Sequence, residues 1–114
     1  MTAFRLLLIV FLVIIVGYTA PVIANHGANL FSDFFGDILA FGWPGQFNVD
    51  FATFLALSAL WVAWRHQFSV TGLILAIPAF FGGMLFLATY LLIVSYSAKG
   101  DVRVLLLGPE RAAA

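Results

Sequence analysis

The sequence contains no cysteine, and this absence excludes several kinds of chemistry. Without thiols the chain cannot form disulfides, cysteine nucleophiles, iron–sulfur clusters or cysteine-ligated zinc sites. Charge is also scarce, because Asp, Glu, Lys and Arg make up 9% of the residues and balance to a net charge of zero. A chain without an excess of basic residues lacks the electrostatic field that recruits nucleic acid. We therefore expect no nucleic-acid partner.

Catalytic motifs are absent as well. The sequence has no Gly-rich phosphate-binding loop, no pair of carboxylates within an apolar segment and no Ser/His/Asp arrangement. We therefore expect a protein that is not an enzyme and that has neither a catalytic metal nor a required cofactor.

Apolar side chains, by contrast, are abundant. They make up 64% of the 114 residues, and the mean hydropathy is +1.12. A water-soluble domain of this length could not bury so much apolar surface. We therefore expect a lipid bilayer to solvate most of the chain.

Three apolar segments are long enough to cross a bilayer as helices, which takes about 20 residues for an apolar layer about 30 Å thick. They are residues 4–23, 47–64 and 70–97. The first also resembles a secretory signal peptide, but its apolar stretch is longer than usual, so we interpret it as a retained anchor. The third is too long for one perpendicular crossing, and we expect it to tilt, to kink at Pro78 or to project beyond the membrane.

Between the first two spans, residues 29–42 have the pattern of an amphipathic helix. Apolar side chains recur there at helical spacing, at Leu30, Phe31, Phe34, Phe35, Ile38 and Leu39. We expect this helix to lie in the membrane interface as a cap over the outer end of the third span. The predicted fold is a single all-α membrane domain, residues 1–114, with three transmembrane helices, this interfacial helix and a tail, residues 100–114.

Two stripes of small residues predict how the second and third spans pack. The stripes are Ala52, Ala56, Ala59 and Ala63 in one span and Gly72, Ala76, Ala79 and Gly83 in the other. Their shared spacing keeps each stripe on one helical face, and an antiparallel register about the turn at Gln67 pairs them position by position. Small residues let helix backbones approach closely, which drives association in lipid. We predict a tight antiparallel hairpin with these eight residues as its seam.

Asp50 is the only acidic residue close to an apolar span, and an ionisable group at that depth suggests a functional site. With Asn48, Thr89 and Tyr90 it would form a polar pocket able to hold a quinone headgroup, a lipid headgroup or a proton. The alternative is structural: Asn48 caps the start of the second span, and Asp50 lies in its positively polarised first turn. We prefer the capping interpretation.

The two histidines follow the first and second spans, at His26 and His66. This order predicts opposite membrane faces, about 30 Å apart, so one metal ion cannot bind both. A single axial bond from either to haem or chlorophyll is an open alternative, although neither lies in the middle of a span.

The basic residues give conflicting indications of orientation. Arg5 and Arg65 fall on one side of the membrane, and residues 25–46 contain no Lys or Arg, which predicts a cytoplasmic N-terminus. With three crossings, the opposite side would nevertheless carry the three basic residues of the tail, Lys99, Arg103 and Arg111. We give more weight to the first helix and the short loop, and we expect a periplasmic C-terminus.

The order of these features resembles a family of small three-span bacterial membrane proteins known only as a domain of unknown function. The resemblance rests on the short apolar first span, on residues 30–35, on residues 48–51 at the start of the second span and on residues 61–66 at its end. It covers about residues 18–107. The resemblance implies a bacterial inner-membrane location, and it supplies no activity and no catalytic residues.

These observations favour a non-enzymatic accessory or scaffold subunit of a larger membrane complex, respiratory or photosynthetic, in contact with lipids and other integral membrane subunits. Three spans cannot bury all of their bulky apolar side chains among themselves. One alternative is a small homo-oligomeric transporter or channel with Asp50 in its path, although the middle of each span is apolar apart from Thr53 and Ser58. Another is a membrane module that binds quinone, lipid or pigment at its Phe-rich cap.

Overall fold

The computed structural model describes all residues, 1–114, as helices joined by short turns, with no β-strand. The helices are α1 (Thr2–His26), α2 (Phe31–Leu39), α3 (Trp43–Arg65), α4 (Val70–Ser97), α5 (Val102–Leu107) and α6 (Pro109–Ala113). Three of them, α1, α3 and α4, are long and apolar enough to cross a membrane. The all-helical class and the number of such helices are therefore confirmed.

The helix boundaries follow local capping chemistry. α4 has the predicted bounds and begins after Ser69, whose hydroxyl accepts a hydrogen bond from the Gly72 amide at 3.2 Å. α3 begins earlier than predicted, at Trp43, because Pro44 suits a first turn in which its nitrogen needs no hydrogen-bond partner. Asn48 therefore lies inside α3, and the interpretation of Asn48 as its N-cap is wrong.

The backbone of α4 breaks at Gly83, near the middle of its 28 residues. Gly83 has φ 54° and ψ −138°, a conformation that is open to glycine and strained for any residue with a Cβ atom. The backbone stays helical at Pro78. The expected kink therefore exists, but it lies at the glycine and not at the proline.

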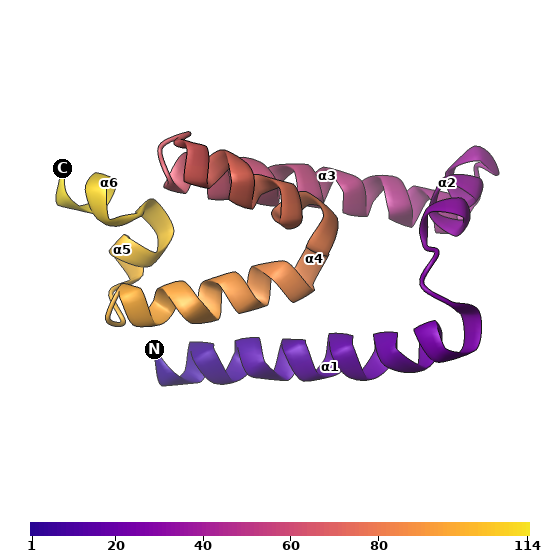
Figure 1. The fold of residues 1–114 in the computed structure, drawn as a ribbon, viewed down its shortest axis with the longest axis horizontal. Helices are drawn as coiled ribbons and strands as arrows, with labels where there is room; N and C mark the ends of the chain where they lie inside the picture. The colour runs from indigo at the N-terminus through magenta and orange to yellow at the C-terminus, as the bar shows by residue number, and fades with distance from the viewer.

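At this break α4 reverses direction. The hydroxyl of Tyr90 lies 2.6 Å from Nε2 of His66, a residue in the turn that precedes α4. A straight helix would instead place Tyr90 about 30 Å from Val70 at the start of α4. The second half of the helix therefore returns to the end of the molecule at which the first half began (Figure 1).

The two halves of α4 pack against different helices. The first half lies along α3, where a Cβ atom added to Gly72 would be 3.5 Å from the Cα of Ala63. The second half lies antiparallel to α1, and Nε of Arg5 donates to Oγ of Ser95 at 2.9 Å. The buried core lies toward the end of the molecule at which α4 both begins and ends. It consists of Val62, Ala79, Tyr90, Val94, Ala98 and Leu105.

Both chain termini lie at this same end (Figure 1). The tail helices α5 and α6 pack beside the end of α3, where Nε of Arg65 donates to the carbonyl of Leu105 at 2.8 Å. The expectation that the N- and C-termini lie on opposite sides assumed that α4 crosses the molecule. Because α4 turns back at Gly83, the C-terminus returns to the side of the N-terminus.

The opposite end is formed by α2, which packs on the first turns of α3. Gly45 allows this approach, since a Cβ atom there would be 2.9 Å from the Cα of Ile38. Nδ2 of Asn48 donates to the carbonyl of Phe34 at 3.1 Å and ties the two helices together. The expected cover by α2 over the end of α4 does not form, because α4 turns back before it reaches α2 (Figure 1).

Candidate functional site

The most connected polar cluster in the molecule is centred on Arg65 at the end of α3. Its side chain is buried, with 6% of the residue exposed. Nε and Nη2 donate to the carbonyls of Leu105 and Val104 in α5, at 2.8 and 3.2 Å, and Nη1 donates to the Tyr90 hydroxyl at 3.2 Å. A cation is favourable beside the carbonyls of a helix C-terminus. One guanidinium thus joins α3 to α5 and to the returning half of α4.

His66 completes the cluster. The Tyr90 hydroxyl accepts a hydrogen bond from Arg65, so its own proton is free to be donated to Nε2 of His66, 2.6 Å away. This arrangement requires a neutral imidazole at His66. Burial lowers the pKa of His66 below its usual 6.5, and the positive charge of Arg65 lowers it further. The neutral form that the hydrogen bond needs is therefore the form that the surroundings favour.

Sequence reasoning missed this cluster. In the sequence, Arg65 and His66 only mark the end of the second span, and Tyr90 was expected beside Asp50 at the other end of the fold. Arg65 and Tyr90 are 25 residues apart, so no local sequence pattern pairs them. Only the reversal of α4 brings them together.

The structure does not bring the predicted polar pocket together. Asn48 is bonded to α2, Oγ1 of Thr89 donates to a carbonyl of its own helix at 2.7 Å, and Tyr90 belongs to the Arg65 cluster. Asp50 is exposed beside a hollow of about 500 Å³ between α2 and α3.

Of the eight predicted seam residues, Gly72 and Ala63 approach each other closely, near the turn between α3 and α4. A Cβ atom at Gly72 would be 3.1 Å from the carbonyl oxygen of Ala63, and Ala79 is fully buried. Half-buried positions are Ala52, Ala59, Ala76 and Gly83, whereas Ala56 is exposed. The close approach thus belongs to the first half of α4, before the helix leaves α3.

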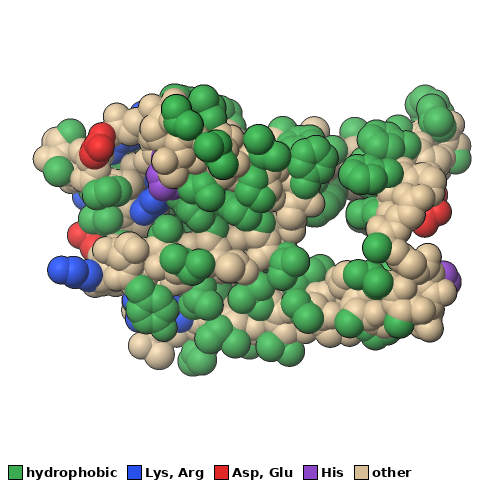
Figure 2. Space-filling view, in the orientation of Figure 1, with side chains coloured by type: hydrophobic (Ala, Val, Ile, Leu, Met, Phe, Trp, Pro, Cys, Tyr) green, Lys and Arg blue, Asp and Glu red, His purple; other side chains and the backbone are tan.

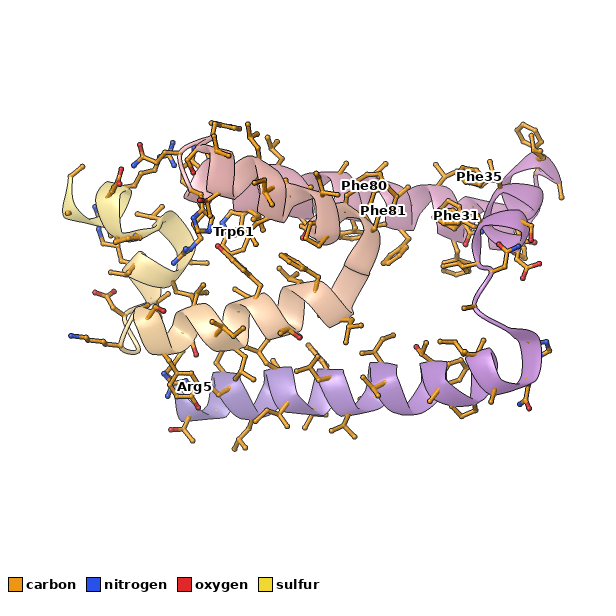
Figure 3. The ribbon with its side chains drawn as sticks, viewed as in Figure 1. Arg5, Phe31, Phe35, Trp61, Phe80 and Phe81 are labelled. Atoms are coloured by element: carbon orange, nitrogen blue, oxygen red, sulfur yellow. The ribbon has the colours of Figure 1, made fainter.

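The apolar residues predicted to form the interfacial cap divide into two faces of α2. Phe34 and Ile38 are half-buried toward α3, and the exposed members are Leu30, Phe31, Phe35 and Leu39. The rings of Phe31 and Phe35 stack with their centroids 6.4 Å apart, far from the core (Figure 3). The exposed face of α2 therefore remains available to lipid or to another protein.

Between α2 and the reversal of α4, the molecule is open. The space-filling view shows a gap between these two parts of the fold (Figure 2). At its edge a hollow of about 240 Å³ is lined by Val16 and Thr19 of α1, by Phe51 of α3 and by the residues around Gly83. Beyond the reversal of α4, α1 and α3 therefore lack a common partner within this chain.

The basic residues are concentrated at one end of the molecule. The five Lys and Arg residues lie at the end that holds the termini, as the blue side chains of Figure 2 show. The guanidinium carbon of Arg5 lies 3.8 Å from the centroid of the Tyr96 ring, and that of Arg111 lies 4.1 Å from the Trp64 ring. The face of an aromatic ring attracts a cation, and Trp and Tyr are enriched at membrane–water interfaces.

Titratable side chains form no group that could hold a metal ion. His26 ends α1 and His66 follows α3, so the histidines lie at opposite ends of the molecule. Comparison with protein-family models, with curated proteins and with solved structures finds no match. The features of the chain that bear on its function are the arrangement of the helices, the gap between them and the distribution of charge.

Proposed function

We propose that this protein resides in a membrane, with α1 and α3 crossing the bilayer and α4 entering and leaving on the same side. α1 and α3 have 25 and 23 residues, which suffices for an apolar layer about 30 Å thick. Each half of α4 has about half that length. Irregular backbone inside a bilayer needs shielding by protein or a water-filled cavity. Gly83 has such shielding on one side, where a Cβ atom would lie 3.0 Å from the ring of Phe51.

The charge distribution supports one orientation of this arrangement. Lys and Arg favour the cytoplasmic side of membrane proteins, and all five such residues lie at the end with the termini. A folded-back α4 thus removes the conflict between the basic tail and the rest of the sequence. We place both termini in the cytoplasm, and the family resemblance adds the bacterial inner membrane to this proposal.

Within the membrane, the protein would act as a non-enzymatic accessory subunit that packs against other integral membrane subunits. The gap between α1 and α3 carries this proposal. Leu8 is the only buried residue of α1, and the far halves of α1 and α3 present bulky apolar side chains to the gap and to the surroundings. Membrane helices associate by close packing, and a transmembrane segment of a partner would supply the packing that the chain lacks there.

Site-specific photo-crosslinking in native membranes tests the accessory role. A photoreactive phenylalanine at Thr19, on the edge of the gap, should crosslink to one discrete membrane protein. The same residue at Tyr18, which is 75% exposed and does not line that hollow, is the matched control. Lipid adducts alone at Thr19, together with a clean monomer after extraction in mild detergent, would contradict the accessory role.

The break in α4 favours a second candidate, a small homo-oligomeric transporter. Discontinuous helices commonly form substrate and ion sites in transporters, because the broken backbone exposes polar groups at membrane depth. Asp50 does not line the hollow at this break. Solute or ion flux in proteoliposomes that is lost on Asp50→Asn would nevertheless favour the transporter over the accessory subunit.

A further inference from the structure

A separate hollow opens at the basic end of the molecule. It has a volume of about 440 Å³ and lies between the first turn of α1 and the tail. Its walls are almost entirely apolar, with Ala3 and Phe4 on one side and Val102, Leu105 and Leu106 on the other. Leu105 is buried, whereas Val102 is 57% exposed and Leu106 is 50% exposed. The hollow is thus an open apolar groove and not a closed core cavity.

Three basic residues are next to residues that line this groove in the sequence. Arg5 follows Phe4, Lys99 precedes the lining residue Gly100, and Arg103 follows Val102. The start of α1, the turn after α4 and the start of α5 meet here, so three parts of the chain each carry a cation next to a residue that lines the groove.

None of these cations forms a salt bridge with a carboxylate of the chain. The side-chain hydrogen bonds of Arg5 go to the hydroxyl and carbonyl oxygens of Ser95, and Nε of Arg103 donates to the carbonyl of Ala112 at 3.1 Å. Lys99 is exposed. The nearby Asp101 accepts from the backbone amides of residues 103 and 104 at 2.9 and 3.4 Å, and so caps α5. The groove is therefore apolar, and the residues that flank its lining in the sequence include three cations that form no salt bridge.

We propose that this groove binds an anionic phospholipid of the cytoplasmic leaflet. An acyl chain would lie between α1 and α5, and the phosphate would lie near Arg5, Lys99 and Arg103. Long basic side chains at the membrane surface attract anionic headgroups, each contributing roughly 1 kcal/mol, or about fivefold in affinity. A zwitterionic lipid gains less, because its own ammonium group balances the phosphate. The inference rests on the membrane placement proposed above and is independent of the accessory role.

Native mass spectrometry of the full chain, with phosphatidylglycerol or phosphatidylcholine added at equal concentration, tests the proposal. We expect the chain to retain phosphatidylglycerol in preference to phosphatidylcholine. In the double variant Lys99→Gln/Arg103→Gln this preference should fall about 25-fold, because each charge contributes about fivefold. Arg111→Gln is the matched control. It removes a cation from the same end of the molecule, but Arg111 packs on Trp64 and neither of its chain neighbours lines the groove. Lys99→Arg should retain the preference.

Three results would overturn the inference: equal retention of the two lipids, the same loss per charge in Arg111→Gln as in the double variant, or a preference unchanged by the double variant. Circular dichroism identifies a double variant that fails to fold, and the single variant Lys99→Gln then carries the test with an expected loss of about fivefold. Labelling of single introduced cysteines with a membrane-impermeant maleimide tests the membrane placement independently. A chain that inserts as proposed but shows no lipid preference refutes this inference alone.

Discussion

At the scale of single residues, Arg65 makes more side-chain hydrogen bonds to other helices than any other residue. Its guanidinium makes three hydrogen bonds to groups in α4 and α5, and no carboxylate takes part. A buried cation with only neutral acceptors is costly, and here three hydrogen bonds from its Nε, Nη1 and Nη2 atoms offset part of that cost. Arg65 therefore holds the returning half of α4 and the tail in place at the cost of a buried charge.

Arg65→Met should destabilise the fold by about 2–4 kcal/mol, because it leaves the Leu105 carbonyl without its charged donor. Thermal unfolding in detergent measures this change, and limited proteolysis should show earlier cleavage of the tail. Arg103→Met, at an exposed position, should change stability by less than about 0.5 kcal/mol. Equal stabilities of the two variants would contradict the anchoring role of Arg65.

His66 should make the fold sensitive to acid. Its pKa is lowered in the folded protein from the usual 6.5, so the unfolded chain binds the proton more readily. The stability that neutral His66 contributes is therefore present above about pH 6.5 and decreases as the pH falls below it. Unfolding in detergent between about pH 7 and pH 5 measures this slope. His66→Gln should flatten it and His26→Gln should not, whereas an unchanged slope in His66→Gln would refute the assignment.

The residue scale is also where sequence reasoning was least able to predict the structure. Arg65 and His66 could be placed at the end of the second span, but their partner Tyr90 is distant in the sequence and was placed with Asp50. Side-chain partners of this kind depend on the path of the backbone, and a wrong path for α4 moved Tyr90 to the wrong end.

At the scale of helices, the long apolar segments were predictable because length and hydropathy alone determine them. The bounds of α4 were correct, since Ser69 provides a clear N-cap. The break at Gly83 was not predicted, because a glycine in a stripe of small residues looks the same whether it serves close packing or a reversal of the backbone. The unexplained length of the third span and the basic tail were the two signals of the reversal.

The packing of α3 against the first half of α4 should depend on Gly72. A Cβ atom there would be 2.7 Å from the Cβ of His66 and 3.1 Å from the carbonyl oxygen of Ala63, so Gly72→Ala should destabilise the fold by about 1–3 kcal/mol. Gly17→Ala is the matched control, because nothing lies within 4 Å of the added atom. Thermal unfolding in detergent compares the two, and equal effects would argue against close approach at Gly72.

The reversal of α4 should be visible as a distance. Spin labels on Thr71→Cys and Ser97→Cys, near the two ends of α4, would be roughly 40 Å apart on a straight helix and should be much closer on the folded-back one. Gly83→Ala adds strain of about 1–3 kcal/mol and should lower stability or lengthen this distance. A distance near 40 Å in the chain with Gly83 intact would exclude the reversal.

At the scale of the whole molecule, the reversal of α4 explains three features together. It gathers the basic residues at one end, it brings both termini to that end, and it leaves α1 and α3 unpartnered beyond Gly83. The packed end and the open end differ accordingly. The packed end carries the Arg65 cluster and the proposed lipid groove, and the open end offers apolar faces to a partner.

The most direct test of this account is the sidedness of single cysteines, which is straightforward because the natural chain contains none. Variants Thr2→Cys, Asp33→Cys and Ala114→Cys, expressed in intact cells, are treated with a membrane-impermeant maleimide before and after permeabilisation. We predict that positions 2 and 114 react only after permeabilisation and that position 33 reacts in intact cells. Labelling of positions 33 and 114 from the same side, with position 2 on the other, would show that α4 crosses the membrane and would contradict the account.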